Sequence, residues 1–184
     1  MANVFGGGGR RLHLSNGGTE VFLDVLLLAV SALAERPWEH RFAALLTWHD
    51  QNAVGRGAVG FDLAEIDWGP SPQERAAAKD FVLRVLDLAL RRHRWDELGY
   101  EPPFAADQLR EYRAIVEAFE PVGTVPGHSF PGPDEAADVC CVRHRVLFPQ
   151  GSGRGACSAA GRRVRTRRND CTVNRWLTVQ RVST

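Results

Sequence analysis

Residues 71–100, SPQERAAAKDFVLRVLDLALRRHRWDELGY, form the stretch from which the fold of this chain is best read. Ser71 is a residue type that caps helix N-termini, Pro72 suits the first helical position, and Glu74 completes a capping box. Apolar residues then recur at the spacing of one helical face, namely Ala78, Phe81, Val82, Val85, Leu86 and Ala89. The Pro-Pro pair at Pro102 prevents continuation. The stretch therefore predicts a helix whose broad apolar face needs partners elsewhere in the chain.

Three further segments supply such partners. Residues 19–35 are apolar around nearly the whole helical circumference, residues 38–53 carry apolar residues on one face, and residues 109–119 repeat a helical stripe. A second capping-box pattern predicts a short turn of helix over residues 62–68. We therefore expect a mainly α fold, a small four-helix bundle-like domain over residues 19–120.

The two ends of the chain differ from this domain. Residues 1–18 are glycine-rich and predict a flexible N-terminus, whereas residues 121–184 are rich in Pro, Gly and Arg with little periodicity. That composition predicts a mostly irregular, basic C-terminal tail that is largely disordered. The charge divides in the same way: residues 1–120 hold 13 Lys and Arg against 18 Asp and Glu, and residues 121–184 hold 10 against 4. An alternative explanation for the sequence beyond residue 150 is that it is translated from a shifted reading frame in GC-rich DNA.

The densest basic run lies in this tail and comprises Arg162, Arg163, Arg165, Arg167 and Arg168. Clustered arginines neutralise phosphates, so the run predicts salt-sensitive, sequence-independent binding to nucleic acid. A solvated tail explains the same composition without any partner. Nucleic acid is therefore the second kind of partner that we weigh for this chain.

The location predicted from the sequence is cytoplasmic. No cleavable signal peptide is visible, and the longest apolar run, residues 21–34, is shorter than the roughly 20 residues that span a bilayer. We expect no membrane partner and four reduced thiols. A zinc site assembled from Cys141, His144, Cys157 and Cys171 is a weak alternative, because the later spacings lack a second close pair. We predict no bound metal and no cofactor.

Two motifs suggest chemistry without establishing it. Residues 55–60, GRGAVG, match the dinucleotide-binding pattern, but no strand–turn–helix unit surrounds them, so a flexible glycine connection is the favoured interpretation. His49, Asp50 and His93 are residue types that a metal-dependent hydrolase or nuclease uses. Nothing in their spacing fixes a shared geometry, and an ordinary structural role for polar residues at a helix end is the favoured interpretation.

Part of the chain resembles a known group of proteins. The segments LHLSNGGTEVFLDVLLLAVSALAE, GRGAVGFDLAEIDW and RRHRWDELGYEPPF, all within residues 1–120, are similar to a group of small actinobacterial proteins of unassigned function. The resemblance implies no catalytic role for any residue.

The leading functional hypothesis is a non-enzymatic regulatory or protein-interaction module. Five tryptophans in 184 residues leave room for an adhesive surface, and aromatic and arginine side chains dominate protein interfaces. The predicted binding surface consists of Trp38, Trp48, Arg91, Arg94 and Trp95. We therefore expect the main partner to be another protein.

Overall fold

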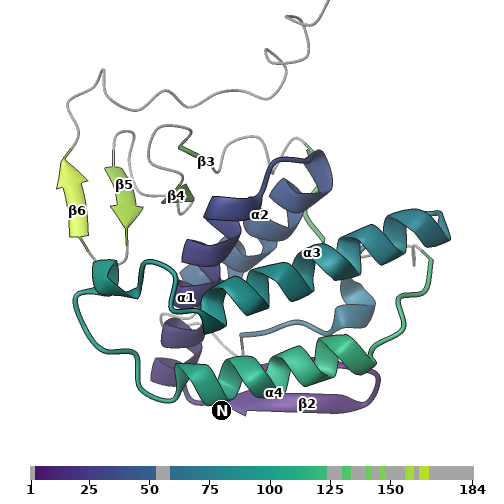
Figure 1. The fold of residues 1–184 in the computed structure, drawn as a ribbon, viewed down its shortest axis with the longest axis horizontal. Coiled ribbons are helices and arrows are strands. Elements are labelled where there is room, and N and C mark those ends of the chain that lie inside the picture. Colours follow the sequence, from purple (N-terminus) through teal and green to yellow (C-terminus); the bar gives the residue numbers. More distant parts are fainter. Residues whose placement is uncertain are drawn as a thin grey trace, which may run out of the picture.

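The structure is a computed structural model that describes residues 3–52, 59–123, 130–133, 140–141, 146–147, 156–159 and 162–165. Within these residues the chain is mainly helical, as predicted, and holds four α-helices, shown in Figure 1. They are α1 (Asn16–Leu33), α2 (Pro37–Asn52), α3 (Pro72–Leu90) and α4 (Ala105–Ala118). The four-helix, bundle-like fold class predicted from the sequence is confirmed.

Helix α1 is the centre of the bundle. It packs against α2, α3 and α4, and most of its apolar side chains are fully buried. By length and composition alone α1 resembles a membrane-crossing segment, but half of that 18-residue window is buried by the rest of the protein. An all-round apolar helix of this kind is what the interior of a bundle requires.

The start of α3 follows the predicted local chemistry. Ser71 Oγ accepts the Glu74 N–H at 3.1 Å, and Glu74 Oε2 accepts the Ser71 N–H at 3.0 Å, which completes the capping box. The six predicted apolar positions of this helix are all buried. The helix ends at Leu90, well before the end of the quoted stretch at Tyr100. Arg92 and Arg94 adopt the left-handed conformation, through which an α-helix does not continue. A short 3-10 helix, η2 (Trp95–Leu98), follows.

The prediction of a flexible N-terminus is wrong for the residues that the structure describes. Strand β1 (Asn3–Gly7) pairs with strand β2 (Arg10–Leu14) as an antiparallel hairpin, with Phe5 opposite Leu12. Phe5 is completely buried, and its ring centroid lies 5.0 Å from that of Phe22 in α1. The hairpin is therefore part of the core. Ser15 caps α1, so the helix begins before residue 19, where the apolar stretch was predicted to start.

A segment after α2 extends the hairpin by one more backbone pairing. The Val4 N–H donates to the Val59 carbonyl at 2.9 Å, and the Gly6 N–H donates to the Phe61 carbonyl at 3.0 Å. Gly60 sits between these two contacts with φ +131, and a Cβ at this position would lie 1.8 Å from the Val4 carbonyl oxygen. Glycine is thus required here by both conformation and space.

The chain beyond α4 contributes to the domain. Phe130 is only 8% exposed and belongs to the hydrophobic core. Strands β3 (Cys140–Cys141) and β4 (Val146–Leu147) pair with each other, as do β5 (Ala156–Ala159) and β6 (Arg162–Arg165), and β4 lies beside α1 and α2. The compact unit therefore extends past the predicted boundary at residue 120. The predicted disorder of the rest of the tail falls outside the described residues.

We expect Gly60→Ala to lower the free energy of unfolding by about 2–4 kcal/mol, since the added Cβ collides with backbone and the backbone conformation disfavours an L-residue. The matched control is Gly17→Ala in the first turn of α1, where a Cβ meets nothing within 4 Å. That control should leave stability unchanged or raise it by about 0.5–1 kcal/mol. Urea unfolding followed by circular dichroism measures both. Equal effects of the two substitutions would contradict the close approach of Gly60 to β1.

Candidate functional site

A groove between the start of α2 and the first half of α3 is a strongly apolar hollow. It encloses about 370 Å³, and apolar atoms form most of its lining. We call it the Trp38 groove. Its apolar walls come from Pro37, Trp38, Trp68, Pro70, Ala77, Ala78, Phe81 and Pro133, and its polar rim from Arg36, Glu39, Arg41, Asp67, Gly69 and Glu74. Concave apolar sites with a few polar groups at the edge are where proteins bind ligands and peptides.

Aromatic rings hold Trp38 in place. Its ring stacks on Phe42 at 5.8 Å and on Trp68 at 5.9 Å, and it meets Phe81 edge-on at 6.2 Å. The Trp38 Nε1–H donates to the Asp67 carbonyl at 2.5 Å. Because each surrounding ring fixes another direction, the half-buried indole is presented to the groove in one orientation.

The position of Trp38 follows from how α2 begins. Glu39 Oε2 accepts the backbone N–H groups of Glu35 at 2.8 Å and Arg36 at 2.9 Å, and Pro37 occupies the first turn. These bonds satisfy donors that a helix start would otherwise leave unpaired. Glu39 is only 6% exposed, and its carboxylate also lies 3.8 Å from Arg84 Nη2. Its charge is therefore used to fix the helix start.

The opposite rim is fixed by an ion pair. Arg41 Nη1 lies 3.0 Å from Asp67 Oδ2, and Asp67 Oδ1 accepts the Gly69 N–H at 3.2 Å. Gly69 has φ +99, and a Cβ here would lie 2.8 Å from the Glu74 Cβ. The turn that carries Trp68 into the groove thus depends on a glycine and on the ion pair.

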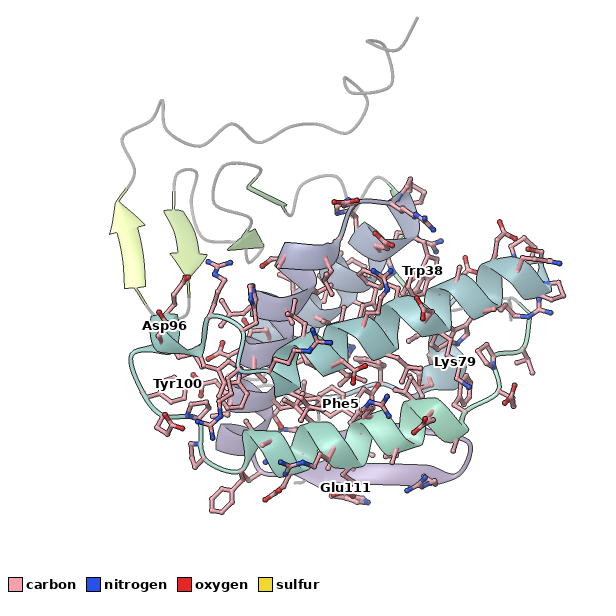
Figure 2. All side chains as sticks on the ribbon, in the orientation of Figure 1. Phe5, Trp38, Lys79, Asp96, Tyr100 and Glu111 are labelled. Atoms are coloured by element: carbon pink, nitrogen blue, oxygen red, sulfur yellow. The ribbon has the colours of Figure 1, made fainter. Side chains whose placement is uncertain are left out.

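A second, more polar hollow of about 540 Å³ lies near the end of α3. Arg92, Trp95, Asp96, Gly99, Tyr100 and Glu101 line it. The Arg92 guanidinium lies 5.5 Å from the Trp95 ring centroid and 3.4 Å from Glu101 Oε1. Figure 2 shows Trp38 toward one end of the molecule and Asp96 and Tyr100 toward the other. The two hollows are therefore separate sites.

The structure divides the predicted binding surface between these two places. Trp38 lines the groove, whereas Trp95 is 7% exposed and lines the second hollow with its indole Nε1 buried. Arg94 is half-buried and forms a two-point ion pair with Glu97, at 2.6 Å and 2.7 Å. Arg91 is exposed at the end of α3, and Trp48 is half-buried in α2. The five residues do not form the single contiguous patch that the sequence suggested.

The three residues of the hydrolase hypothesis have different surroundings. His49 faces the segment after α2, with its ring centroid 5.2 Å from that of Phe61, and its Nδ1 accepts the Gly60 N–H at 3.4 Å. Burial lowers the pKa of His49 to about 4, so the ring is neutral at neutral pH. His93 Nε2 is buried without a hydrogen-bond partner in the described part of the chain. Within that part, no group of three His, Cys, Asp or Glu side chains is arranged to hold a metal ion.

Asp50 instead belongs to an acidic cluster between α1 and α2. Burial, and then the charges of Asp24 and Glu20, raise the pKa of Asp50 to about 7. Burial likewise raises the pKa of Asp24, whose Oδ2 accepts the Tyr100 hydroxyl at 2.8 Å. The hydroxyl bond ties the loop after η2 to α1. Burial first, and the neighbouring carboxylates second, therefore let Asp50 retain its proton near neutral pH.

The remaining sequence motifs are only partly described. Of the GRGAVG motif the structure describes Val59 and Gly60, and Gly60 is explained by its contact with β1. Arg162, Arg163 and Arg165 lie in β6, while Arg167 and Arg168 fall outside the described residues. Of the weak zinc pattern, Cys141 lies in β3 and Cys157 in β5, and His144 and Cys171 fall outside the described residues. Binding of nucleic acid by the tail stays a prediction.

Comparisons with protein-family models, with curated proteins and with solved structures give no significant match to this chain. Functional inference therefore depends on the geometry of the chain itself.

Three contributors to the groove were missed in the sequence. Trp68 and Asp67 follow a short capped 3-10 helix, η1 (Leu63–Glu65). The capping signal at Asp62 predicted this turn, but it did not predict that Asp67 and Trp68 line the groove. Phe130 lies in a Pro/Gly-rich stretch that composition marks as a linker. A single aromatic residue between prolines was the only available signal.

We expect the contribution of Asp50 to the free energy of unfolding to fall as the pH rises from about 4 to 7, because Asp50 binds its proton more tightly in the folded than in the unfolded chain. Buried His49, whose pKa is lowered to about 4, acts in the opposite direction, so the variant Asp50→Asn is compared with the wild type at each pH. The stabilisation by Asp50 is present below this window and is lost through it. Asp50→Asn should therefore stabilise the protein at pH 8 by about 1–3 kcal/mol, since each unit of raised pKa corresponds to about 1.4 kcal/mol. Urea titrations at pH 4.5 and 8 measure the difference. The exposed Asp96→Asn serves as control, and an equal gain in both variants would contradict the assignment.

Proposed function

We propose that this protein is a non-enzymatic interaction module that binds a segment of another polypeptide in the Trp38 groove. The single observation that carries the proposal is an accessible apolar hollow whose central tryptophan is held by three rings and a hydrogen bond. A site fixed before binding loses little conformational freedom when the ligand arrives.

The chemistry of the rim supports binding rather than catalysis. Each of the three groove carboxylates is engaged in the fold: Glu39 at the start of α2, Asp67 with Arg41, and Glu74 in the capping box of α3. Groups that hold backbone donors and an ion pair are poorly suited to exchange protons with a substrate. Aromatic and arginine side chains around an apolar centre are the composition of protein-binding hot spots.

The residues that line the groove suit an extended segment rather than a folded surface. Between the capped start of α3 and Phe81, the residues that line the groove are Ala77 and Ala78, whose side chains are small. Pro37, Pro70 and Pro133 form exposed edges. Small side chains on one wall and prolines at the edges leave room for a peptide lying along the groove.

The proposal predicts that a randomised peptide library displayed on phage enriches binders to the wild-type protein and that Ala77→Arg abolishes this binding. Ala77 is exposed and lines the groove, so the long charged side chain fills it at little cost to the helix. The affinity of enriched peptides should fall at least about tenfold, which corresponds to about 1.4 kcal/mol.

Ala76→Arg is the matched control for this prediction. Ala76 is the neighbouring exposed residue of α3 and does not line the groove. The same substitution there should leave peptide affinity unchanged. Failure to enrich any binder, or equal losses in the two variants, would refute binding in the groove.

A further inference from the structure

One end of the Trp38 groove is already covered by a short segment of the chain itself. Phe130 packs against Trp38 with ring centroids 5.8 Å apart, and it is 8% exposed. Pro131 is also buried, and Pro133 forms part of the groove wall. The four-residue sequence of this segment, Phe-Pro-Gly-Pro, is thus seated on the aromatic floor.

Arg41 provides the polar anchor of the segment. Its Nε–H donates to the Pro131 carbonyl at 2.6 Å, and its guanidinium carbon lies 4.5 Å from the Phe130 ring centroid. The same guanidinium is oriented by Asp67 at 3.0 Å. Arg41 therefore contacts both a backbone carbonyl and the face of an aromatic ring in the segment.

This arrangement is the chemistry by which extended proline-containing peptides are recognised. Proline has a fixed φ and no N–H, so such a peptide offers rings and carbonyl acceptors but few donors. Aromatic grooves that bind these peptides pack the rings between aromatic side chains and donate to the carbonyls. The Trp38 groove supplies stacked rings from Trp38 and Trp68 and a donor from Arg41.

We infer that the Trp38 groove is a site for a proline-containing, extended segment of a partner protein, and that Phe130–Pro133 is an internal ligand that competes for it. The inference rests on the proposed function and adds the chemical class of its ligand. The open part of the groove, between Pro37, Pro70 and Ala77, gives the partner a place to begin binding while the internal segment is still seated. Because the internal segment is tethered to the groove, its effective concentration is high, and it lowers the apparent affinity of any added peptide.

The test uses the full chain and a synthetic peptide, acetyl-SFPGPD-amide, whose sequence is that of residues 129–134. Binding is followed by tryptophan fluorescence in the wild type and in Phe130→Ala, which removes the ring that seats the internal segment. We expect the peptide to bind Phe130→Ala about tenfold more tightly than the wild type. A second peptide with both prolines replaced by alanine should bind Phe130→Ala at least about fivefold more weakly, since it is more disordered before binding.

Two variants keep the result decisive. Ala77→Arg in the Phe130→Ala background should abolish the fluorescence change, which locates the peptide in the groove. Should Phe130→Ala fail to melt cooperatively, the double substitution Pro131→Ala with Pro133→Ala takes its place, because it weakens the internal segment and leaves Arg41 and Phe130 intact; a gain in peptide affinity of about fivefold is expected.

The outcomes separate this inference from the proposed function. Equal affinity of the wild type and the variant, or equal affinity for the two peptides, overturns the internal-ligand assignment. Library peptides that lack proline and still depend on Ala77 would then leave the groove as a peptide site with a different ligand class. Absence of any Ala77-dependent peptide overturns both.

Discussion

The backbone pairing between β1 and the segment after α2 is the contact on which the rest of the fold depends. It joins residues more than fifty positions apart, through Val4 to Val59 and Gly6 to Phe61. Asn3 reinforces it: its Oδ1 accepts the Val59 N–H at 2.8 Å, and its Nδ2 donates to Thr19 Oγ1 at 2.7 Å. These bonds satisfy buried polar groups whose loss would cost about 1–3 kcal/mol each.

The pairing places Phe5 where the hairpin, α1, α4 and the segment after α2 meet. Its ring lies 5.4 Å from Phe61 and 6.1 Å from Tyr112, in addition to its contact with Phe22. In Figure 2, Phe5 lies between α3 and α4, deep in the molecule. Rings from the hairpin, from α1, from α4 and from the segment after α2 thus form one cluster. A second ring series connects the groove to this interior, since Trp68 contacts both Trp38 at 5.9 Å and Phe119 at 5.7 Å.

Local signals in the sequence were sufficient for the helices. The capping box at Ser71 and the apolar stripe of α3 depend only on residues three or four positions apart, and both were predicted and confirmed. The hairpin was missed because Gly6 to Gly9 resemble a flexible start, and the residues that stabilise it, Phe22 and the segment from Val59 to Phe61, are distant in the sequence. The exposure of Trp38 and Trp95 was overestimated for the same reason. Phe130, which covers Trp38, is far from it in the sequence, and no glycine marks the left-handed backbone at Arg92 and Arg94 beside Trp95.

The return of the chain to α2 after α4 has a consequence for biosynthesis. A protein is made from its N-terminus, so the four helices emerge before the aromatic residue that seals the start of α2. Until residue 130 has left the ribosome, the part of the Trp38 indole that Phe130 contacts stays exposed on the nascent bundle. The last ring to be synthesised in the described core is therefore the one that closes it.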